Sequence, residues 1–107
     1  MEYKVIIESP ADQDARDYVR FIAVENSEPD AARRWLDGLE SLISDLAVMP
    51  RRFPVIEEQA EFALELRQLR HHSHRVIYHV DDETQIVHIL RIYHGRREML
   101  TEVDIKF

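Results

Sequence analysis

Residues 29–50 read PDAARRWLDGLESLISDLAVMP, and this stretch decides the fold. Its apolar residues recur every three or four positions, a spacing that puts them on one face of a helix. They are Ala32, Trp35, Leu36, Leu39, Leu42, Ile43 and Leu46. Pro29 suits the first turn of a helix, whereas Pro50 cannot continue one. The pattern therefore predicts a helix that begins near Pro29 and closes at Met49–Pro50, with one face buried.

A shorter helical pattern precedes this one. Four apolar residues share a helix face, namely Ala15, Tyr18, Val19 and Ile22. The segment SPAD before them is typical of a helix start: Ser9 can cap the helix, Pro10 suits its first position, and Asp12 favours the positive end of the dipole. The pattern fades at ENSEPD, residues 25–30. About five residues separate the two helices, so we expect an antiparallel helical hairpin.

Segments with strand character flank the two helices. EYKVIIE (2–8) precedes them, and three others follow: ALELRQL (63–69), HRVIYHV (74–80) and QIVHILRIYH (85–94). Alternating apolar residues and β-branched side chains favour strands, and DDET (81–84) has the length of a hairpin turn. Residues 50–62 show no period and predict a loop, whereas residues 95–107 could form a short helix or one more strand.

The order of elements is therefore β, α, α, β, β, β. This order predicts the α+β class, with an antiparallel sheet that the helical hairpin covers on one face. The last three strands would form an antiparallel meander, and pairing the first strand with one of them would join the two ends of the chain. The strand order is not readable from the sequence. At 107 residues the chain has the usual length of one domain, spanning 1–107.

The composition excludes several classes of site. There is no cysteine, which removes disulfides, thiolate metal sites and cysteine nucleophiles. Two glycines are too few for a phosphate-binding loop, and Gly38 falls inside the second helix, where it would permit close packing. Glu57 and Glu58 fall in the predicted loop, where we expect them to be solvated. No apolar run approaches the roughly 20 residues of a membrane span, so we expect a cytoplasmic protein with no membrane partner and no cofactor.

The charge is unevenly distributed along the chain. The formal net charge is -7, yet residues 63–107 hold seven acidic and seven basic residues and contain all six histidines. An acidic balance argues against nonspecific binding of nucleic acid, because such binding depends on neutralising phosphates with Lys and Arg. The C-terminal half is nevertheless a distinct electrostatic region.

The histidines raise the question of a metal site. His71, His72 and His74 have no carboxylate between them, and neighbouring residues of a strand point to opposite faces. This pattern favours a solvated or partner-facing loop over a metal site, so we expect no metal. His79 and His88 lie on facing strands of a short hairpin and could form a cross-strand pair on the surface of the sheet.

Arginines are the remaining candidates for function. Five lie on or at the ends of the predicted strands, where a sheet could bring them to one exposed face, and they are Arg67, Arg75, Arg91, Arg96 and Arg97. A guanidinium group binds phosphate or carboxylate in a fixed fork and stabilises developing negative charge. Together with His94, such a face suits phosphodiester chemistry or recognition of an acidic partner. A solvated, salt-bridged sheet edge explains the same pattern equally well.

Three stretches together resemble the ParE/RelE superfamily, the toxins of bacterial type II toxin-antitoxin modules. They are the helical region at residues 9–54, LRQL at 66–69, and HRVIYHVDDETQIVHILRIYHGRRE at 74–98. The similarity covers nearly the whole chain in order. It implies a small α+β domain with two N-terminal helices against an antiparallel sheet, and a ParE-like plasmid-stabilisation toxin that binds a cognate antitoxin.

The RelE branch of the superfamily implies an mRNA endonuclease that acts in the ribosome. In that reading Arg75 matches a functional arginine at the start of RVIYHV, Arg97 matches one in GRRE, and His94 or Tyr93 is the proton donor. The lysines that the family has on the preceding strand are absent, and a late tyrosine is replaced around Val103. Half of the family's catalytic set is therefore missing.

The ParE branch implies a toxin that inhibits DNA gyrase by binding and has no hydrolytic chemistry. The long helical hairpin, LRQL and HGRRE resemble this branch more closely. We therefore expect a gyrase-inhibiting toxin whose functional surface consists of Arg67, Arg75, His94, Arg96 and Arg97. The ribosome and mRNA are the alternative target. The acidic balance leaves open a non-toxic orphan member, and a homodimer through the helical hairpin also stays open.

Overall fold

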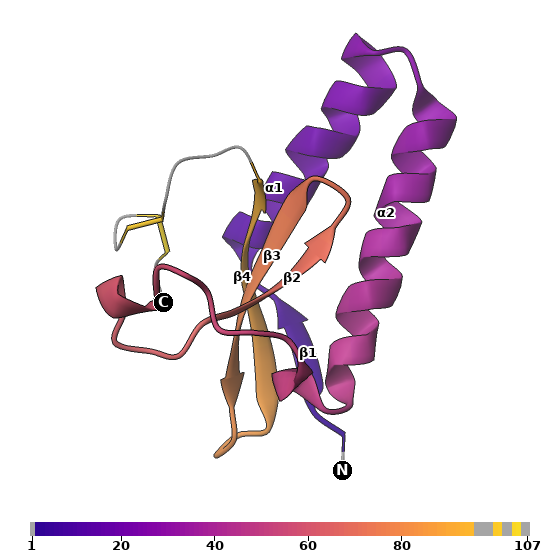
Figure 1. Ribbon diagram of the computed structural model, residues 1–107. Coiled ribbons are helices and arrows are strands. Elements are labelled where there is room, and N and C mark those ends of the chain that lie inside the picture. Colours follow the sequence, from indigo (N-terminus) through magenta and orange to yellow (C-terminus); the bar gives the residue numbers. More distant parts are fainter. Residues whose placement is uncertain (1, 96–99, 102–103, 106–107) are drawn as a thin grey trace.

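The computed structural model describes residues 2–95, 100–101 and 104–105. Within these residues four strands and two α-helices follow one another (Figure 1): β1 (Lys4–Ile7), α1 (Ser9–Arg20), α2 (Pro29–Ser44), β2 (Arg67–His71), β3 (His74–Asp81) and β4 (Ile86–His94). Shorter helical turns occur at Phe21–Glu25, Asp45–Ala47, Pro50–Arg52 and Gln59–Glu61. The predicted class and order of elements are confirmed. No helix in the described part of the chain is long and apolar enough to cross a membrane.

The strands form one sheet in the order β1-β4-β3-β2. β2, β3 and β4 pair antiparallel, as a meander requires, and β1 pairs with β4, so the first strand does join a later one. This last pair is parallel, with Ile6 opposite His88, and the expectation of a wholly antiparallel sheet is wrong there. A long connection that includes both helices separates β1 from β4, which gives the chain room to return in the same direction.

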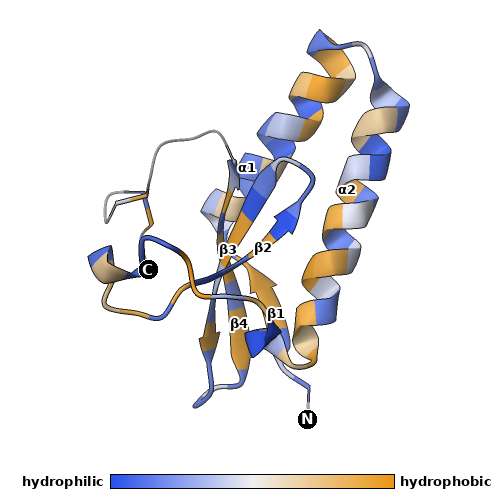
Figure 2. Ribbon diagram, in the orientation of Figure 1, coloured by the Kyte–Doolittle hydropathy of each residue, from blue (hydrophilic) through white to orange (hydrophobic). Residues whose placement is uncertain are grey.

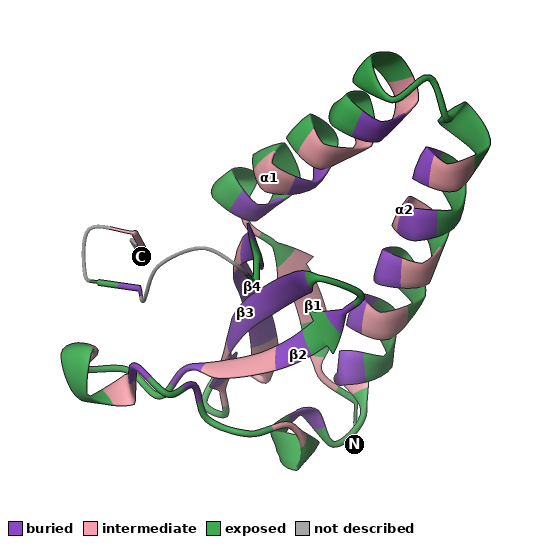
Figure 3. Cartoon of the chain, turned by 45° about the horizontal axis from the view of Figure 1, so that its top comes forward, coloured by how far each residue is buried: buried purple, intermediate pink, exposed green. Residues whose placement is uncertain are grey.

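The helical hairpin covers one face of this sheet. Its buried residues keep the predicted helical spacing: Ala11 and Ala15 in α1, Ile22 in the following turn, and Ala32, Trp35, Leu39 and Ile43 in α2. Figure 2 shows apolar residues alternating with polar ones along both helices, and Figure 3 shows that the buried residues lie on their inner sides. These residues pack against alternate residues of β3 and β4, which include Val76, Tyr78, Val80, Val87 and Ile89.

The ends of the helices differ in detail from the predicted ones. Ser9 is already the first residue of α1, Glu8 occupies the capping position, and no side chain there caps the helix with a hydrogen bond. At its other end α1 continues into a π-helical turn, Phe21–Glu25. Ser27 then adopts a left-handed backbone conformation, with φ 54°, before α2 begins. The two helices extend well beyond the sheet as an antiparallel hairpin (Figure 1).

The opposite face of the sheet carries a second, smaller core. Strand residues from this face pack with residues of the α2–β2 connection and of the C-terminal segment: Ile56, Leu66, Ile77, Leu90, Tyr93, Leu100 and Ile105. Figure 1 shows the connection and the C-terminal segment on the side of the sheet away from the helices. The predicted loop at 50–62 therefore lies on the sheet rather than free in solvent. After Gly95, the described residues include no helix or strand.

Candidate functional site

Histidines cluster where β2 turns into β3. His72 and Ser73 form the turn, with His72 in the left-handed region at φ 55°, and His71 and His74 pair across it. Both paired histidines are buried, and Nε2 of His71 lies 2.8 Å from the carbonyl oxygen of Trp35. The solvated loop expected here is therefore wrong for His71 and His74. The strands continue up to a two-residue turn, and their ends lie against α2.

α2 approaches β2 closely at Gly38. A Cβ atom at this position would lie 2.9 Å from Cε1 of His71, a distance that real Cβ atoms essentially never show. The absence of a side chain at Gly38 therefore lets the His71 ring lie against the helix and reach the backbone of Trp35. This contact agrees with the close packing expected at Gly38 and identifies β2 as the packing partner.

An aromatic cluster encloses the ring of His74. The ring centroid lies 4.1 Å from that of Tyr18, 5.2 Å from that of Trp35 and 5.2 Å from that of His94. Burial lowers the pKa of His74 to about 4, and the neighbouring His94 acts in the same direction. His74 is therefore neutral at pH 7. Among the described residues, no three His, Cys, Asp or Glu side chains are grouped so that they could hold a metal ion.

Arg75 and Glu58 form a buried ion pair on the other face of the sheet. The two terminal nitrogens of Arg75 each donate to one oxygen of Glu58 at 2.8 Å, and Nε of Arg75 donates to Gln68 at 2.7 Å. The backbone N–H of Leu100 donates to the same Glu58 carboxylate at 3.0 Å. The side chains of Arg75 and Glu58 are only 10% and 2% exposed. Two expectations are therefore wrong: Arg75 does not lie on an exposed face, and Glu58 is not solvated.

Ionisation of Glu58 depends on this pairing. Burial alone would raise the pKa of the carboxyl group, because it disfavours the charged form. The hydrogen bonds from Arg75 and from the Leu100 N–H outweigh burial and lower the pKa of Glu58 to about 2. The Glu58 carboxylate is therefore charged at neutral pH. The pair connects β3 with the α2–β2 connection and with the C-terminal segment.

Arg91 has a comparable structural role on β4. Its guanidinium donates twice to Asp14 of α1, at 2.8 Å for each bond, and Asp14 also accepts the backbone N–H of Ile92 at 2.9 Å. Asp14 stands three residues after Ala11 and four before Tyr18, on the face of α1 that packs against the sheet. This spacing puts a charged side chain on the buried face of α1, which indicates a buried partner, but Asp14 was not among the predicted functional residues.

Arg67 is engaged at the start of β2. Its guanidinium donates to the carbonyl oxygens of Arg51 at 3.2 Å and Phe53 at 2.6 Å, and it lies 2.9 Å from the Glu65 carboxylate. These contacts hold the α2–β2 connection against the sheet. Arg67 pairs with Tyr78 in the sheet, whereas Arg75 lies near the β2–β3 turn, so the two arginines do not converge.

The part of the predicted arginine face that the structure describes is not assembled. Arg75 pairs with Tyr93 across the β3–β4 ladder, and His74 pairs with His94. Successive residues of a strand point to opposite faces, so His94 lies on the face of His74 and Arg75 lies on the other. Of the predicted surface residues that the structure describes, His94 alone is exposed. Arg96 and Arg97 lie outside the described residues.

Tyr93, the other expected proton donor, is buried, unlike His94. Only 6% of the residue is exposed, and its hydroxyl donates to the backbone carbonyl oxygen of Asp104 at 2.9 Å. The guanidinium of Arg91 lies over the ring, 4.4 Å from its centroid. These contacts place the Tyr93 side chain in the packing between β4 and the C-terminal segment.

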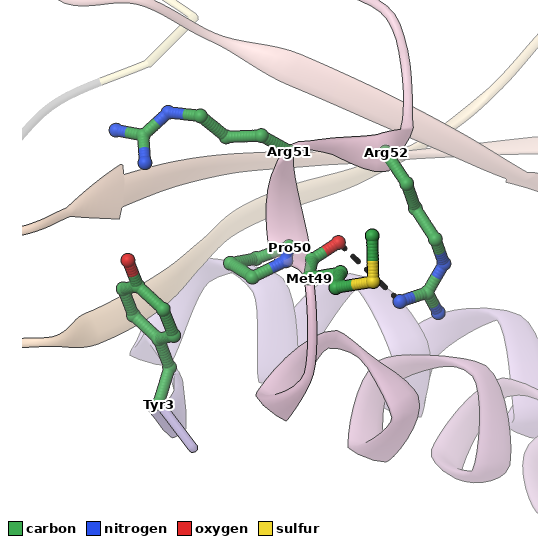
Figure 4. Close-up of a pocket in the computed structure, with 5 residues that line it drawn as sticks. All are labelled: Tyr3, Met49, Pro50, Arg51 and Arg52. Carbon is green, nitrogen blue, oxygen red and sulfur yellow. Dashed lines mark hydrogen bonds between the residues drawn. The ribbon is translucent and has the colours of Figure 1, made fainter. Parts of the chain in front are cut away.

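A shallow apolar pocket of about 440 Å³ lies where β1 meets the α2–β2 connection (Figure 4). Its lining residues are Tyr3, Met49, Pro50, Arg51 and Arg52. The polar groups around it already have partners. The Tyr3 hydroxyl and Arg51 both donate to the carboxylate of Asp82 at 2.7 Å, and Arg51 thereby holds the pKa of Asp82 below its usual value. Arg52 donates to backbone carbonyl oxygens, including that of Met49 (Figure 4).

A second cleft, of about 540 Å³, opens between the two helices beside the β2–β3 turn. Tyr18, Ile22 and Trp35 supply apolar surface in it, whereas Arg34 and Glu28 supply one positive and one negative group. The cleft adjoins the aromatic cluster around His74, because Tyr18 and Trp35 belong to both. It offers a mixed surface that would suit a peptide segment with apolar and charged side chains.

Comparisons with known structures agree with the fold. The RelBE2 toxin-antitoxin complex of Mycobacterium tuberculosis matches with a TM-score of 0.57 and 25% identity, over 88% of this chain and 92% of that chain. The RelE-RelB complex of Pyrococcus horikoshii matches with a TM-score of 0.57 and 26% identity, over 91% and 99%. A mutant RelE toxin of E. coli in the free state has a TM-score of 0.53 and 19% identity, over 90% and 86%, and supports the fold alone.

The sequence comparisons identify the family. No curated protein sequence matches the chain. A family model matches residues 5–99, and it describes the ParE toxin of the type II toxin-antitoxin system, parDE. This match covers both helices and all four strands except Lys4, the first residue of β1. The chain therefore belongs to the ParE toxin family of type II toxin-antitoxin systems, within the ParE/RelE superfamily.

Proposed function

We propose that this toxin inhibits DNA gyrase by binding to it and does not cleave RNA. The main support for this proposal is the buried Glu58–Arg75 pair, which argues against RNA cleavage. A RelE-type endonuclease would need Arg75 to stabilise negative charge on the reacting phosphate, which requires a guanidinium that the substrate can reach. Here Glu58 and Gln68 bind all three guanidinium nitrogens of Arg75, and the side chain is 10% exposed.

The expected proton donors give further support to a binding role. His94 lies on the face of the sheet opposite Arg75, and the Tyr93 hydroxyl is bonded to the backbone of Asp104. General acid catalysis needs the donor within hydrogen-bond reach of the same phosphate that the arginine stabilises. His94 therefore does not face the same phosphate as Arg75, and Tyr93, although it pairs with Arg75 across the β3–β4 ladder, donates its hydroxyl proton to Asp104.

We place the gyrase-binding surface at the end of β4. His94 is exposed there, and Arg96 and Arg97 follow it in the sequence after Gly95. In a chain with a net charge of -7, this basic segment suits an acidic patch or a phosphate on the target. In this proposal Arg67 and Arg75 support the fold and do not touch gyrase.

A cognate antitoxin is the second proposed partner. The complexes from M. tuberculosis and P. horikoshii each contain a toxin with its antitoxin. On this chain we propose that an extended or helical antitoxin segment lies over the helical hairpin and the sheet, with apolar side chains in the cleft beside Tyr18 and Trp35. Arg34 on the same cleft would pair with an acidic residue of that segment.

Induction of the toxin in growing cells tests the proposal. Plasmid supercoiling and the integrity of translated mRNA are measured in the same cultures, by topoisomer gels and by primer extension. We expect relaxed plasmid DNA, arrested growth and intact message. The Arg97→Ala variant should restore growth and supercoiling, whereas Arg16→Ala, a change on the exposed face of α1, should leave toxicity unchanged.

The alternative is a RelE-like, ribosome-dependent mRNA endonuclease. It is favoured by the matching complexes from M. tuberculosis and P. horikoshii, which contain RelE-type proteins. Codon-periodic cuts in translated mRNA with normal plasmid supercoiling would overturn the gyrase proposal in favour of this one. Normal growth after expression of the toxin alone would instead favour a non-toxic orphan member.

A further inference from the structure

β1 forms one edge of the sheet, and its outer side has no partner strand in the described part of the chain. The backbone N–H groups of Lys4 and Glu8 donate to carbonyl oxygens of β4 and of the residue before it, each at 2.9 Å. Alternate residues of a strand direct their backbone groups to opposite sides, so Val5 and Ile7 direct theirs away from β4. An unpaired edge of this kind is a template for another strand.

Two contacts limit how far a second strand can pair with this edge. The N–H of Tyr3 also points outward, but it donates to the carbonyl oxygen of Ala47 at 2.7 Å, so pairing cannot extend to Tyr3. At the other end the chain leaves the sheet at Ser9, where α1 begins, whereas Glu8 still has an extended backbone. The open edge is therefore KVIIE, residues 4–8.

The open edge complements itself in one antiparallel register. Residues whose backbone groups point towards the partner strand lie opposite one another in such a pair. Only the register with Val5 opposite Ile7 of a second copy uses both of these residues on both strands. It places Ile6 opposite Ile6 on a two-fold axis, and it places Lys4 of each copy opposite Glu8 of the other.

The charged side chains in this register lie on one face and have opposite signs. Val5 packs against the core under the helices, so Lys4, Ile6 and Glu8 share the other face. Lys4 is exposed, and the Glu8 side chain is 39% exposed. Oε1 of Glu8 lies 3.4 Å from Nδ1 of His88, which leaves Oε2 for a lysine. Opposite charges that face one another across two strands stabilise the pair, whereas like charges destabilise it.

We propose that the chain self-associates through β1, so that the sheets of two copies join into one continuous sheet. Ile7, which is 42% exposed in the single chain, is covered by Val5 of the second copy. The two-fold axis is perpendicular to the joined sheet, so both helical hairpins lie on the same side of it. An interface centred on one short strand belongs to the weak, transient class. This self-association is independent of gyrase inhibition, and each can be tested without the other.

Sedimentation of the purified full chain at concentrations up to about 1 mM tests the proposal. We expect a reversible dimer. Lys4→Glu places like charges opposite one another twice in each dimer and should weaken association at least about tenfold. The double variant Lys4→Glu, Glu8→Lys restores opposite charges and should recover most of the lost affinity. Arg33→Glu is the matched control, because it makes the same change of charge at an exposed position of α2 and should leave association unchanged.

A cross-linking experiment tests the register directly, since the chain has no cysteine. Ile6 and its copy form a pair without backbone hydrogen bonds between them, in which the Cα atoms lie about 4.5 Å apart, within reach of a disulfide. Ile6→Cys should therefore give a covalent dimer under mild oxidation. Lys4→Cys should stay mostly monomeric, because residue 4 of one copy lies opposite residue 8 of the other.

Three results would overturn the proposal. The unchanged chain could remain monomeric at every concentration, or it could form a dimer whose affinity Lys4→Glu does not alter, which would place the contact on another surface. Alternatively, Ile6→Cys could form a cross-link to a co-produced antitoxin and none to itself. That result would assign the β1 edge to the antitoxin.

Discussion

Replacing Arg75 by Met would leave the charge of Glu58 buried without its partner. The Glu58 side chain is 2% exposed, so water cannot replace the two hydrogen bonds that Arg75 donates. Breaking a buried ion pair from one side costs about 3 to 5 kcal/mol. A domain of this size is stable by about 5 to 15 kcal/mol, so Arg75→Met should remove a large part of the free energy of unfolding.

The double variant Glu58→Met, Arg75→Met removes both charges, so it distinguishes the free energy that the ion pair contributes from the cost of leaving one charge buried and unpaired. Replacing both partners by apolar side chains of similar volume is often neutral or stabilising, so the double variant should be more stable than Arg75→Met. Arg16→Met is the control, because it breaks an ion pair with Asp12 in which both side chains are more than half exposed. Its free energy of unfolding should stay within about 1 kcal/mol of the unchanged chain.

The pH dependence adds an independent check. The folded pKa of Glu58 is about 2 and its ordinary value is 4.5, so the carboxylate stabilises the fold above pH 4.5 and loses this effect as the pH falls towards 2. The difference corresponds to about 3 kcal/mol. Urea unfolding, followed by the fluorescence of Trp35 at several pH values, measures both effects. A free energy of unfolding for Arg75→Met within 1 kcal/mol of the unchanged chain at pH 7 would refute this reasoning.

Three further predictions concern the core. Burial lowers the pKa of His74 to about 4, so the midpoint of its NMR titration should lie near pH 4. The free energy of unfolding should fall as the pH drops from 6.5 towards 4, because the unfolded chain then takes up a proton that buried His74 does not. A midpoint near 6.5 would contradict the burial of His74. Asp14→Asn should lower the free energy of unfolding by about 1 to 3 kcal/mol, because it weakens the hydrogen bonds to Arg91. Asp12→Asn, which changes an exposed side chain of the same helix, should lower it by under about 1 kcal/mol. Equal costs for the two variants would count against the Asp14 contacts. Gly38→Ala should lower thermal stability, although alanine is the better helix former, because its Cβ would meet His71; a higher melting temperature would contradict this close approach.

The fold was predictable because its main signals are local and periodic. The stripe from Ala32 to Leu46 defines α2, and the alternation in HRVIYHV and QIVHILRIYH defines β3 and β4. The parallel direction of β1 was not predictable, because it depends on where a long connection returns the chain. The second core was not predictable either, since Ile56, Leu100 and Ile105 belong to segments with no periodic pattern.

The roles of the arginines were harder to predict than their positions. Sequence spacing correctly put Arg75 and Arg91 on strands, but it did not reveal their carboxylate partners. Glu58 lies 17 residues from Arg75 and Asp14 lies 77 residues from Arg91, and only the tertiary fold brings each pair together. The His79–His88 pair was predictable because a short hairpin fixes the register between its two strands.

Supercoiling by purified DNA gyrase, measured with increasing amounts of the purified toxin, tests the central claim most directly. Relaxed plasmid, ATP and gyrase are incubated with the unchanged chain, with Arg97→Ala or with the Arg16→Ala control. We predict that the unchanged chain and Arg16→Ala abolish supercoiling, whereas Arg97→Ala inhibits weakly. Full supercoiling in the presence of a stoichiometric excess of the unchanged chain would contradict the proposal that this toxin acts by binding gyrase.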